Sequence, residues 1–362
     1  MIIKLFKILS ILFVFTNILY SQNKKEVKTY ETEEIIIEGY KVNTDIFTSP
    51  TKIKLISSDE IKNKNGNRLS DIIEMSGNAY IKSYGGNSTL KTISLNGLSA
   101  EHTIILLDGN KLNSFQNSQI DLSQISKDNI ERIEIINDGI SSIYGSEAVS
   151  GVINIISNNP ESLRKTKINL SSQFGSFGFR KYFAKVNQSF NKLSFSASLN
   201  LESSKDDFNY YFSNGNDKVL LKRENSDFNF KDFNFAVNYY LNNKSSLKLL
   251  SNYTDNRRNI PGIETGTPSS ISSQQDYIWT NFLNYENKIN DFTELKSSIS
   301  LQNNLLRYES KPLINSFYRN LSLSSNSQIK VKKLSDLIIG YDLIYGRLSS
   351  NDLVNYPERF QT

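Results

Sequence analysis

The 362-residue chain carries 42 Lys and Arg against 37 Asp and Glu, and its net charge of +5 is spread along the whole length. It has no basic block that would indicate a nucleic-acid partner. Cysteine is absent and His102 is the one histidine, which leaves no disulfide, no thiol catalysis and no Cys or His cluster for zinc or iron. No nucleophile–base or paired-carboxylate constellation stands out, so we do not expect an enzyme.

The first 21 residues have the layout of a secretory signal peptide. Lys4 and Lys7 precede an apolar run at 8–20, and Ser21 stands at the expected cleavage site. The alternative is a membrane anchor, but such a helix needs roughly 20 apolar residues. No later stretch reaches that length. A membrane-embedded form of this exported chain would therefore be a β-barrel.

Residues 41–160 predict a small α+β domain. Strands are expected at 53–56, 91–95, 103–107, 130–136 and 152–156, with helices beginning at Ser58 and at Arg68. The second helix should stop at Gly77, and Asp108-Gly109 is a strong turn dipeptide.

After Pro160 the pattern becomes a two-residue alternation. At 193–202 apolar residues occupy the odd positions and Ser, Asn or Glu the even ones, and the alternation recurs at 233–239, 295–301 and 337–345. Tight polar turns at 191–192, 242–244, 290–291 and 332–333 alternate with longer polar loops at 203–226 and 255–274. This layout is typical of an outer-membrane barrel. A soluble β-sandwich also alternates, but its strands average five or six residues.

The strand count indicates a partial barrel. We count about nine strands, whereas bacterial single-chain barrels have even numbers and plugged lumens belong to barrels of about 22 strands. The prediction is an N-terminal α+β plug followed by the N-terminal part, residues 161–362, of a transmembrane antiparallel β-barrel of the 22-stranded type. We expect the sequence to be a piece of a longer protein. A composition of 11% aromatic but only 38% hydrophobic residues fits a polar-lined, aromatic-girdled barrel.

Two segments resemble the plug of TonB-dependent outer-membrane receptors. One is 91–97 followed by 102–112, where the family has a strand ending in Arg-Gly before a strand ending in Asp-Gly. The other is 130–156, which resembles the family's closing block, "RIEVxxGPxSxxYGSxAxGGVINII". The residues that carry the two matches are Asn96, Gly97, Asp108, Gly109, Arg132, Tyr144, Gly145, Gly151 and Asn154.

The closing block has a plain structural interpretation. We expect Ser141 and Ser146 to cap short helical turns, and Gly145 and Gly151 to let the backbone turn and pack closely. The chain departs from the family at two places. The family's Arg-Gly arginine is Asn96 here, and its Arg-Gly-Pro is Asn137-Asp138-Gly139. Those arginines commonly pair with carboxylates on the barrel wall, so the departures leave the plug–wall charge network open.

Residues 22–40 form the expected periplasmic segment ahead of the plug. A charged, β-branched run at 34–39 could be an ordinary first strand, but in this position it resembles the TonB box. An extended, unpaired strand can add to a partner's sheet edge, which makes TonB the expected partner. The residues of this run are Glu34, Ile35, Ile36, Ile37, Glu38 and Gly39.

The resemblance is nearest to the cobalamin-receptor branch, in which acidic loops bind calcium. Oxygen ligands in a flexible loop suit Ca²⁺, although any barrel displays a charged external loop. The calcium ligands that we expect are Asp206, Asp207, Asp217 and Asp227. Arg257-Arg258 are expected to meet either an anionic siderophore or lipopolysaccharide.

The resemblance implies energised uptake of a large ligand by an outer-membrane receptor surrounded by outer-membrane lipid. A corrinoid is the first candidate for the cargo, and a ferric siderophore or haem is the alternative. A passive porin or adhesin barrel is the alternative from another class, but it leaves the plug motifs unexplained. A soluble periplasmic binding module with a β-sandwich is a third.

Overall fold

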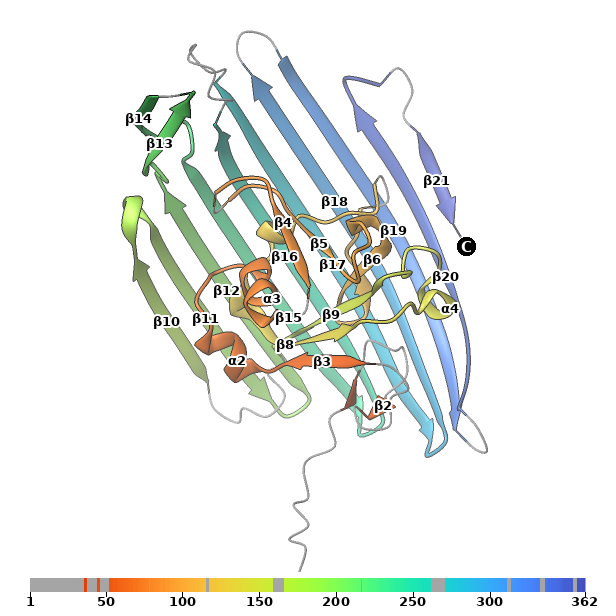
Figure 1. The fold of residues 1–362 in the computed structure, drawn as a ribbon. Helices are drawn as coiled ribbons and strands as arrows, with labels where there is room; N and C mark the ends of the chain where they lie inside the picture. Colours follow the sequence, from red (N-terminus) through yellow and green to blue (C-terminus); the bar gives the residue numbers. More distant parts are fainter. Residues whose placement is uncertain are drawn as a thin grey trace, which may run out of the picture. The chain divides into compact units, whose positions relative to one another are not determined.

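The computed structural model describes residues 36–37, 44–45, 52–77, 79–86, 88–114, 117–158, 166–215, 217–261, 271–310, 314–332, 336–353 and 357–361. A small α+β domain, the plug, lies against one face of a large antiparallel sheet, the wall (Figure 1). None of the helices in these ranges combines the length and the apolar character that a membrane crossing requires.

The plug is built on a five-stranded sheet. Its strands, in spatial order, are β3 (Ile53–Ile56), β8 (Ile130–Ile136), β9 (Gly151–Ser157), β6 (Thr103–Leu107) and β7 (Asn110–Lys111). The central strand β9 pairs antiparallel with β8 and parallel with β6. All seven of its residues are buried, which explains why it reads as a continuous apolar run. A separate hairpin joins β4 (Tyr80–Ser83) to β5 (Lys91–Ser94).

Short helices complete the plug. In α2 (Ser58–Asn63) the Ser57 hydroxyl accepts a hydrogen bond from the Glu60 amide at 3.3 Å, an ordinary N-cap. Helix α3 (Leu69–Ser76) buries one apolar face and ends at Gly77 with φ +69°. The remaining short helices are η1 (Ala100–His102), η2 (Leu122–Gln124), η3 (Lys127–Asn129) and α4 (Ser141–Tyr144). The plug core is mostly isoleucine and leucine.

The wall has ten antiparallel strands, each paired with its neighbour in sequence once the hairpin β13–β14 is set aside. They are β10 (Lys167–Phe174), β11 (Arg180–Phe190), β12 (Leu193–Ser204), β15 (Phe228–Asn242), β16 (Ser245–Ile260), β17 (Ser272–Asn290), β18 (Thr293–Ser310), β19 (Ile314–Lys332), β20 (Asp336–Ser350) and β21 (Glu358–Gln361). Among the described residues β10 and β21 pair on one side only, so the sheet is an open part of a barrel.

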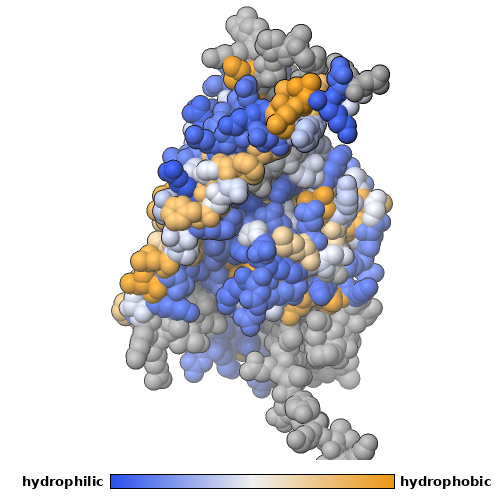
Figure 2. Space-filling model, turned by 60° about the vertical axis from the view of Figure 1, so that its left-hand side comes forward, coloured by the Kyte–Doolittle hydropathy of each residue, from blue (hydrophilic) through white to orange (hydrophobic). Residues whose placement is uncertain are grey.

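The two faces of the wall have opposite character. On β12 the even residues face the plug and are buried, with Asn200 at 1% and Glu202 at 3% exposure, whereas Leu199 on the other face is 43% exposed. The predicted alternation is confirmed, and its polar side points inward. Figure 2 turns the β10 edge toward the viewer and shows apolar side chains exposed at the surface. An apolar exterior and a polar interior are the reverse of a soluble sheet and match a membrane barrel.

The structure corrects three predictions. The loop expected at 203–226 contains a hairpin, β13 (Asn209–Asn214) and β14 (Asp217–Lys222). Strands β16 and β17 also extend into the loop expected at 255–274. The alternation in these strand segments is short or polar, so the sequence pattern did not predict them as strands.

The third correction concerns α4. Its N-cap is Ile140 and no side chain caps it, so Ser141 is the first helical residue rather than the cap. Ser146 lies in the turn that follows the helix. The other predicted plug strands and helices are confirmed within a residue or two, whereas β4 and β7 are additional.

Gly151 is the tightest backbone position in the plug. It has φ +141°, and a Cβ built there would lie 2.3 Å from the Ile136 carbonyl oxygen. We expect Gly151→Ala to destabilise the β8–β9 pair by about 2–4 kcal/mol, because strain and overlap add. Gly145→Ala is the matched control, since Gly145 has φ +82° with nothing within 4 Å and should cost about 1–2 kcal/mol. Hydrogen exchange of the β8 and β9 amides measures the loss of stability in both variants. Equal protection of these amides in the two variants would contradict the close packing of Gly151 against Ile136.

Candidate functional site

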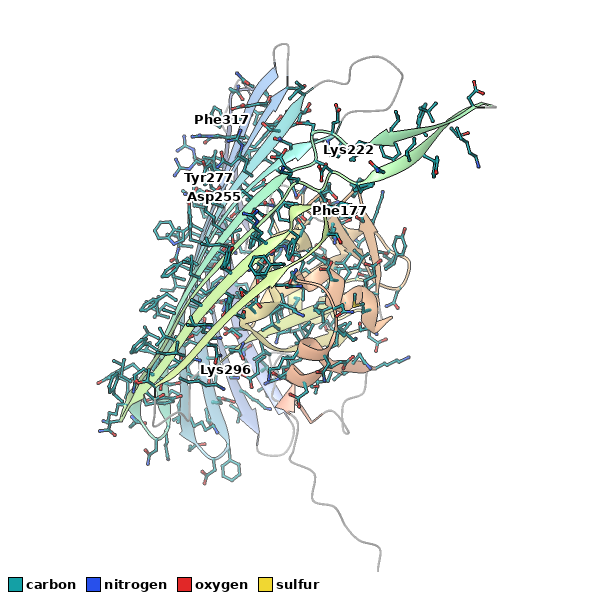
Figure 3. The ribbon with its side chains drawn as sticks, turned by 90° about the vertical axis from the view of Figure 1, so that its left-hand side faces the viewer. Phe177, Lys222, Asp255, Tyr277, Lys296 and Phe317 are labelled. Carbon is teal, nitrogen blue, oxygen red and sulfur yellow. The ribbon has the colours of Figure 1, made fainter. Side chains whose placement is uncertain are left out.

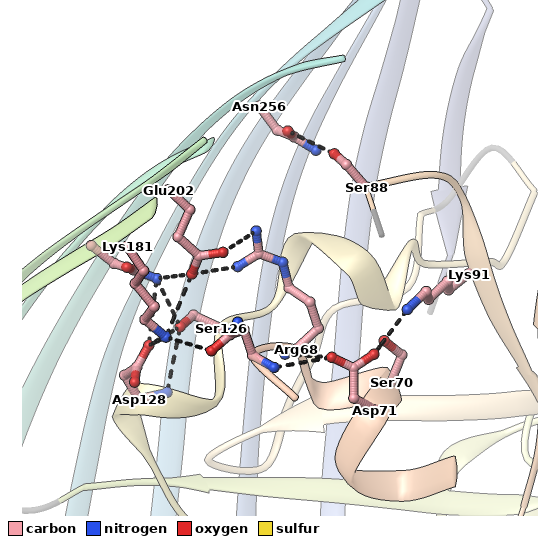
Figure 4. A network of polar contacts seen from close by, with 12 residues as sticks. Arg68, Ser70, Asp71, Ser88, Lys91, Ser126, Asp128, Lys181, Glu202 and Asn256 are labelled. Carbon is pink, nitrogen blue, oxygen red and sulfur yellow. Dashed lines mark hydrogen bonds and ion pairs between the residues drawn. The ribbon is translucent and has the colours of Figure 1, made fainter. Parts of the chain in front are cut away.

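The interface between plug and wall is held by buried charged contacts. Arg68, which begins α3, donates to both carboxylate oxygens of Glu202 on β12, with Nη1–Oε1 at 3.0 Å and Nη2–Oε2 at 2.9 Å (Figure 4). The two side chains are only 5% and 1% exposed. The guanidinium also lies 3.7 Å above the Phe230 ring. A bidentate pair of this kind is strong and directional.

Lys181 on β11 extends this contact into a network. Its Nζ lies 2.7 Å from Asp128 Oδ2 on the plug and 3.5 Å from Glu202 Oε1 on the wall. It also donates to Asn67 Oδ1 at 3.2 Å. Charges of opposite sign therefore alternate across the interface, as Figure 4 shows, so that each buried ion has a partner.

Arg258 on β16 makes a second anchor. It donates to the Ser88 carbonyl at 2.6 Å and to Asp121 Oδ2 at 2.9 Å, both on the plug, and its Nη2 lies 3.2 Å from Asp276 on β17. The side chain is 6% exposed. The expectation that Arg257 and Arg258 together meet an external anion is therefore wrong for Arg258, because alternation along β16 turns it inward. Arg257 is exposed on the opposite face.

The Asp-Gly turn is the third anchor. Asp108 lies 3.0 Å from Lys248 Nζ on β16 and accepts hydrogen bonds from the Ser157 amide and hydroxyl. The Gly109 amide donates to Asn154 Oδ1 at 3.1 Å, and Asn154 in turn donates to Glu134. The two family motifs, distant in sequence, thus meet around one turn.

At the two places where the chain departs from the family pattern, the side chains form hydrogen bonds with other parts of the plug. Asn96 has φ +52°, next to Gly97 at +75°. Its Nδ2 donates to the carbonyls of Asn137 at 2.8 Å and Ser150 at 3.0 Å. Asp138 accepts from the Lys52 amide at 3.0 Å. In place of arginines at these positions, Arg68 and three plug carboxylates make the charged contacts with the wall.

The other plug-motif residues also stay within the plug. Arg132 Nε lies 3.0 Å from Glu134 on the same strand, and Tyr144 ends α4. Gly145 follows with φ +82°, and Gly151 starts β9 against Ile136. These contacts and backbone positions shape the domain.

A chain of polar contacts connects the anchors. Asp121, bound by Arg258, accepts from the Lys91 amide at 3.0 Å, and Lys91 Nζ lies 2.8 Å from Asp71 Oδ1. Asp71 also accepts from the amides of Asn67 and Arg68. Burial opposes ionisation of Asp71, but the Lys91 ammonium and these amides outweigh it and lower the pKa of this carboxyl. Charge thus links the 88–91 turn to the start of α3.

The plug does not fill the space beside the wall. A cavity of about 500 Å³ lies between the two parts. Apolar side chains of the plug and wall line it, together with polar ones from both, including Leu107, Ile155, Leu250, Ile278, Gln124 and Thr254. The anchors are therefore discrete contacts around a gap rather than a continuous packed surface.

The four predicted calcium ligands have separate surroundings in this conformation. Asp207 lies 2.7 Å from Lys222, and Asp227 accepts from Asn259 at 2.6 Å. Asp206 approaches the plug at Gly86, and Asp217 begins β14. No three carboxylates or histidines of the described ranges converge on one point. The present arrangement therefore does not fit a formed calcium site, and calcium stays a prediction.

The predicted TonB box and signal peptide lie largely outside the described residues. Of residues 34–39, only Ile36–Ile37 is described, as the strand β1, which pairs antiparallel with β2 (Thr44–Asp45). The identity of this segment as a TonB box stays a prediction.

A plug held by buried charges against the polar face of an antiparallel wall is the arrangement of a plugged outer-membrane β-barrel. Residues 45–152 match the family model of the TonB-dependent receptor plug domain. Over 132 residues the chain is 32% identical to the vitamin B12 transporter BtuB of Vibrio vulnificus, covering 36% of this chain and 21% of that protein. Over 149 residues it is 24% identical to BtuB of Vibrio cholerae, covering 41% and 24%. Residues 45–152 are thus a plug domain of the TonB-dependent receptor type, and the chain is similar over part of its length to vitamin B12 transporters.

Solved structures agree on the fold. The siderophore receptor PiuA of Acinetobacter baumannii superposes with a TM-score of 0.66 at 12% identity, covering 88% of this chain and 48% of that one. The pyoverdine receptor FpvA of Pseudomonas aeruginosa gives 0.69 at 13% identity, covering 87% and 45%. The chain thus spans about half the length of these receptors. At such identities the likeness concerns the fold alone.

Removing one partner of the Arg68–Glu202 pair should weaken the attachment of helix α3 to the wall. Arg68→Met leaves Glu202 buried beside Lys181 alone, and we expect a loss of about 3–5 kcal/mol in plug stability. Arg68→Met/Glu202→Met should recover much of that loss, because no isolated charge remains. Denaturant titration followed by hydrogen exchange at α3 measures the effect.

Lys222→Met supplies the control for this pair. Its contact with Asp207 is 58% and 31% exposed, so the change should cost less than about 1 kcal/mol. A comparable loss in Lys222→Met and Arg68→Met would show that the buried pair has no special role.

Proposed function

We propose that this chain is the plug and the adjoining wall of an energised importer whose cargo is a corrinoid. The observation that supports the cargo is the 32% identity over 132 residues to a vitamin B12 transporter. The siderophore receptors PiuA and FpvA share the fold at only 12% and 13% identity, so they support the class but not an iron cargo. A ferric siderophore or haem remains the alternative within the family.

The proposed transport cycle uses the anchors described above. Ligand binds at the long-loop end, where the plug turn at Ser88 contacts Arg258. The inner-membrane partner TonB adds the extended segment at 34–39 to its own sheet edge and pulls. The plug then shifts within the wall as its contacts at Arg68, Asp108 and Asp121 open. Each contact is polar and exchangeable for water, so opening it does not require exposing the plug's apolar core.

Export follows from the same proposal. The N-terminal 21 residues act as a cleaved signal peptide, and the wall resides in the outer membrane. The acidic loop residues bind calcium only after ligand-induced or ion-induced rearrangement, because their carboxylates are apart in this conformation.

Binding of candidate cargoes to the full-length protein tests the ligand. We expect cyanocobalamin to bind, and to bind at least about tenfold more weakly once calcium is chelated, since the acidic loop then loses its cation. The variant Asp207→Asn/Asp217→Asn should bind cobalamin with reduced dependence on calcium. Asn315→Asp, which changes a charge on the wall outside the predicted calcium ligands, serves as the charge control. Binding of a ferric siderophore without any corrinoid binding would overturn the cargo while leaving the receptor class intact.

A backbone change in the predicted TonB box tests the energy source. Ile36→Pro removes an amide that strand addition needs, so we expect uptake to fall to the level of a strain without TonB. Surface binding of ligand should be unchanged. Lys28→Pro, outside the 34–39 run, is the matched control and should transport normally. Uptake that survives Ile36→Pro and the loss of TonB would indicate a passive barrel.

A further inference from the structure

Asp232 on β15 and Lys185 on β11 are buried charges on the inward face of the wall, 3% and 6% exposed. Asp232 accepts hydrogen bonds from the neutral side chains of Asn234, Asn252 and Thr254. No cation of the described ranges lies at ion-pair distance from it. The Lys185 ammonium makes neither a hydrogen bond nor an ion pair with a described residue. A buried charge without an ion partner is costly, so a partner of opposite sign would stabilise each of them.

The strand register places both charges next to anchors that the plug already uses. Across β11, β12 and β15, paired inward residues form successive rows that are two residues, or about 7 Å, apart. Lys181 and Glu202, the anchors of the plug, share the first row. Asp232 lies in the second row and Lys185 in the third, each nearer the short-turn end of the wall.

The carboxylate of Asp232 lies one row from the plug cation Arg68. In the present position Arg68 binds Glu202 and lies over the Phe230 ring. Phe230 is two residues before Asp232 on the same strand, and the charge of Arg68 already acts on Asp232. Asn200, directly across from Asp232, has a buried Oδ1 without a hydrogen-bond partner among the described residues. A guanidinium moved by one row would meet both a carboxylate and this amide oxygen.

The ammonium of Lys185 has the same relation to the plug carboxylate Asp128. Asp128 lies between two rows, 2.7 Å from Lys181 Nζ in the first and 3.4 Å from Asn200 Nδ2 in the second. A shift by one row places it between Asn200 and Lys185, and its charge already acts on Lys185. One displacement of the plug therefore gives both plug groups a wall partner of opposite sign.

The plug has room for this displacement. Asp232 and Lys185 both line the cavity of about 500 Å³ between plug and wall. The plug contacts of β16 open in the same movement, but Arg258 keeps Asp276 on the wall and Asp108 keeps a plug amide. The movement thus exchanges partners at the interface rather than leaving these groups without any.

We propose that Asp232 and Lys185 form a second docking position for the plug, one row nearer the short-turn end of the wall. In this position Arg68 binds Asp232 and Asp128 binds Lys185. The role of the position in transport rests on the proposed function, because it is where a pull by TonB first takes the plug. The docking position itself follows from the buried charges, so it can be tested without TonB or cargo.

Disulfide trapping reports the position of the plug in the full-length receptor, because these 362 residues contain no cysteine. Asn129 of the plug accepts a hydrogen bond from Ser198 Oγ at 3.0 Å, so Asn129→Cys/Ser198→Cys gives the resting cross-link. Ser196 is the next inward residue on β12 toward the short turn, so Asn129→Cys/Ser196→Cys gives the displaced cross-link. Otherwise unchanged protein, purified into nanodiscs without TonB or cargo, should form mainly the resting cross-link.

Removal of the first row should move the plug to the second position. In Lys181→Met/Glu202→Met the two plug charges lose their present partners, and we expect the displaced cross-link to rise about tenfold. Adding Asp232→Asn/Lys185→Met should abolish this rise. The proposal is overturned if the displaced cross-link does not rise, or if its rise survives the loss of Asp232 and Lys185. Loss of both cross-links would also overturn it, because the plug would then have left the wall without being held.

The matched control removes an ion pair from the outward face. Lys231 Nζ lies 3.9 Å from Asp255 Oδ2, and Asp255 lies on the side of the sheet away from the plug (Figure 3). Lys231→Met/Asp255→Met should therefore leave the ratio of the two cross-links unchanged. An equal rise of the displaced cross-link in this variant would reduce the effect to a general loosening of the wall and overturn the proposal.

Uptake of cyanocobalamin by cells separates this proposal from the proposed function. If the displaced cross-link forms as expected but wild-type cells take up no cyanocobalamin, the docking position stands and the proposed cargo fails. If wild-type cells take it up in a TonB-dependent manner but removal of the first row gives no displaced cross-link, the docking position alone is overturned.

Discussion

Burial of charge between plug and wall is the constraint on which the rest of this structure depends. An ion at this interface is removed from water, so it is tolerable only with a partner of opposite sign and good geometry. The side chain of Glu202 is 1% exposed and has both Arg68 and Lys181 within ion-pair distance. The polar inner face of the wall and the polar turns of the plug are therefore matched to each other, so that each ion buried between them has a partner.

The contacts between plug and wall have a consistent sign. Asp108, Asp121 and Asp128 of the plug meet cations that the wall supplies, whereas Arg68 carries positive charge across in the other direction. The positions where the family places arginines hold plug carbonyls together instead. A plug can thus keep its fold and its docking while the distribution of charge between plug and wall changes, provided that every buried ion is paired.

The two faces of each wall strand serve different surroundings. Adjacent residues point in opposite directions, so Arg258 anchors the plug while Arg257 is exposed outside. The inward residues determine how firmly the plug is held, and the outward ones determine how the protein meets lipid. The siderophore receptors PiuA and FpvA share the fold with this chain at 12–13% identity, and at that identity the fold alone does not identify a ligand.

The plug elements, the alternation of the wall and the family were predictable from sequence, because period and turn chemistry are local. Helix α3 ending at Gly77 and the Asp108-Gly109 turn are examples. The hairpin β13–β14 escaped prediction, since its alternation spans only six residues a strand. The partners across the interface escaped it too. Arg68 and Glu202 are 134 residues apart in sequence, and only the docking of plug on wall decides that they meet. Sequence determined which residues alternate and turn, whereas tertiary structure decided which charges are buried together, because pairing depends on distance in space.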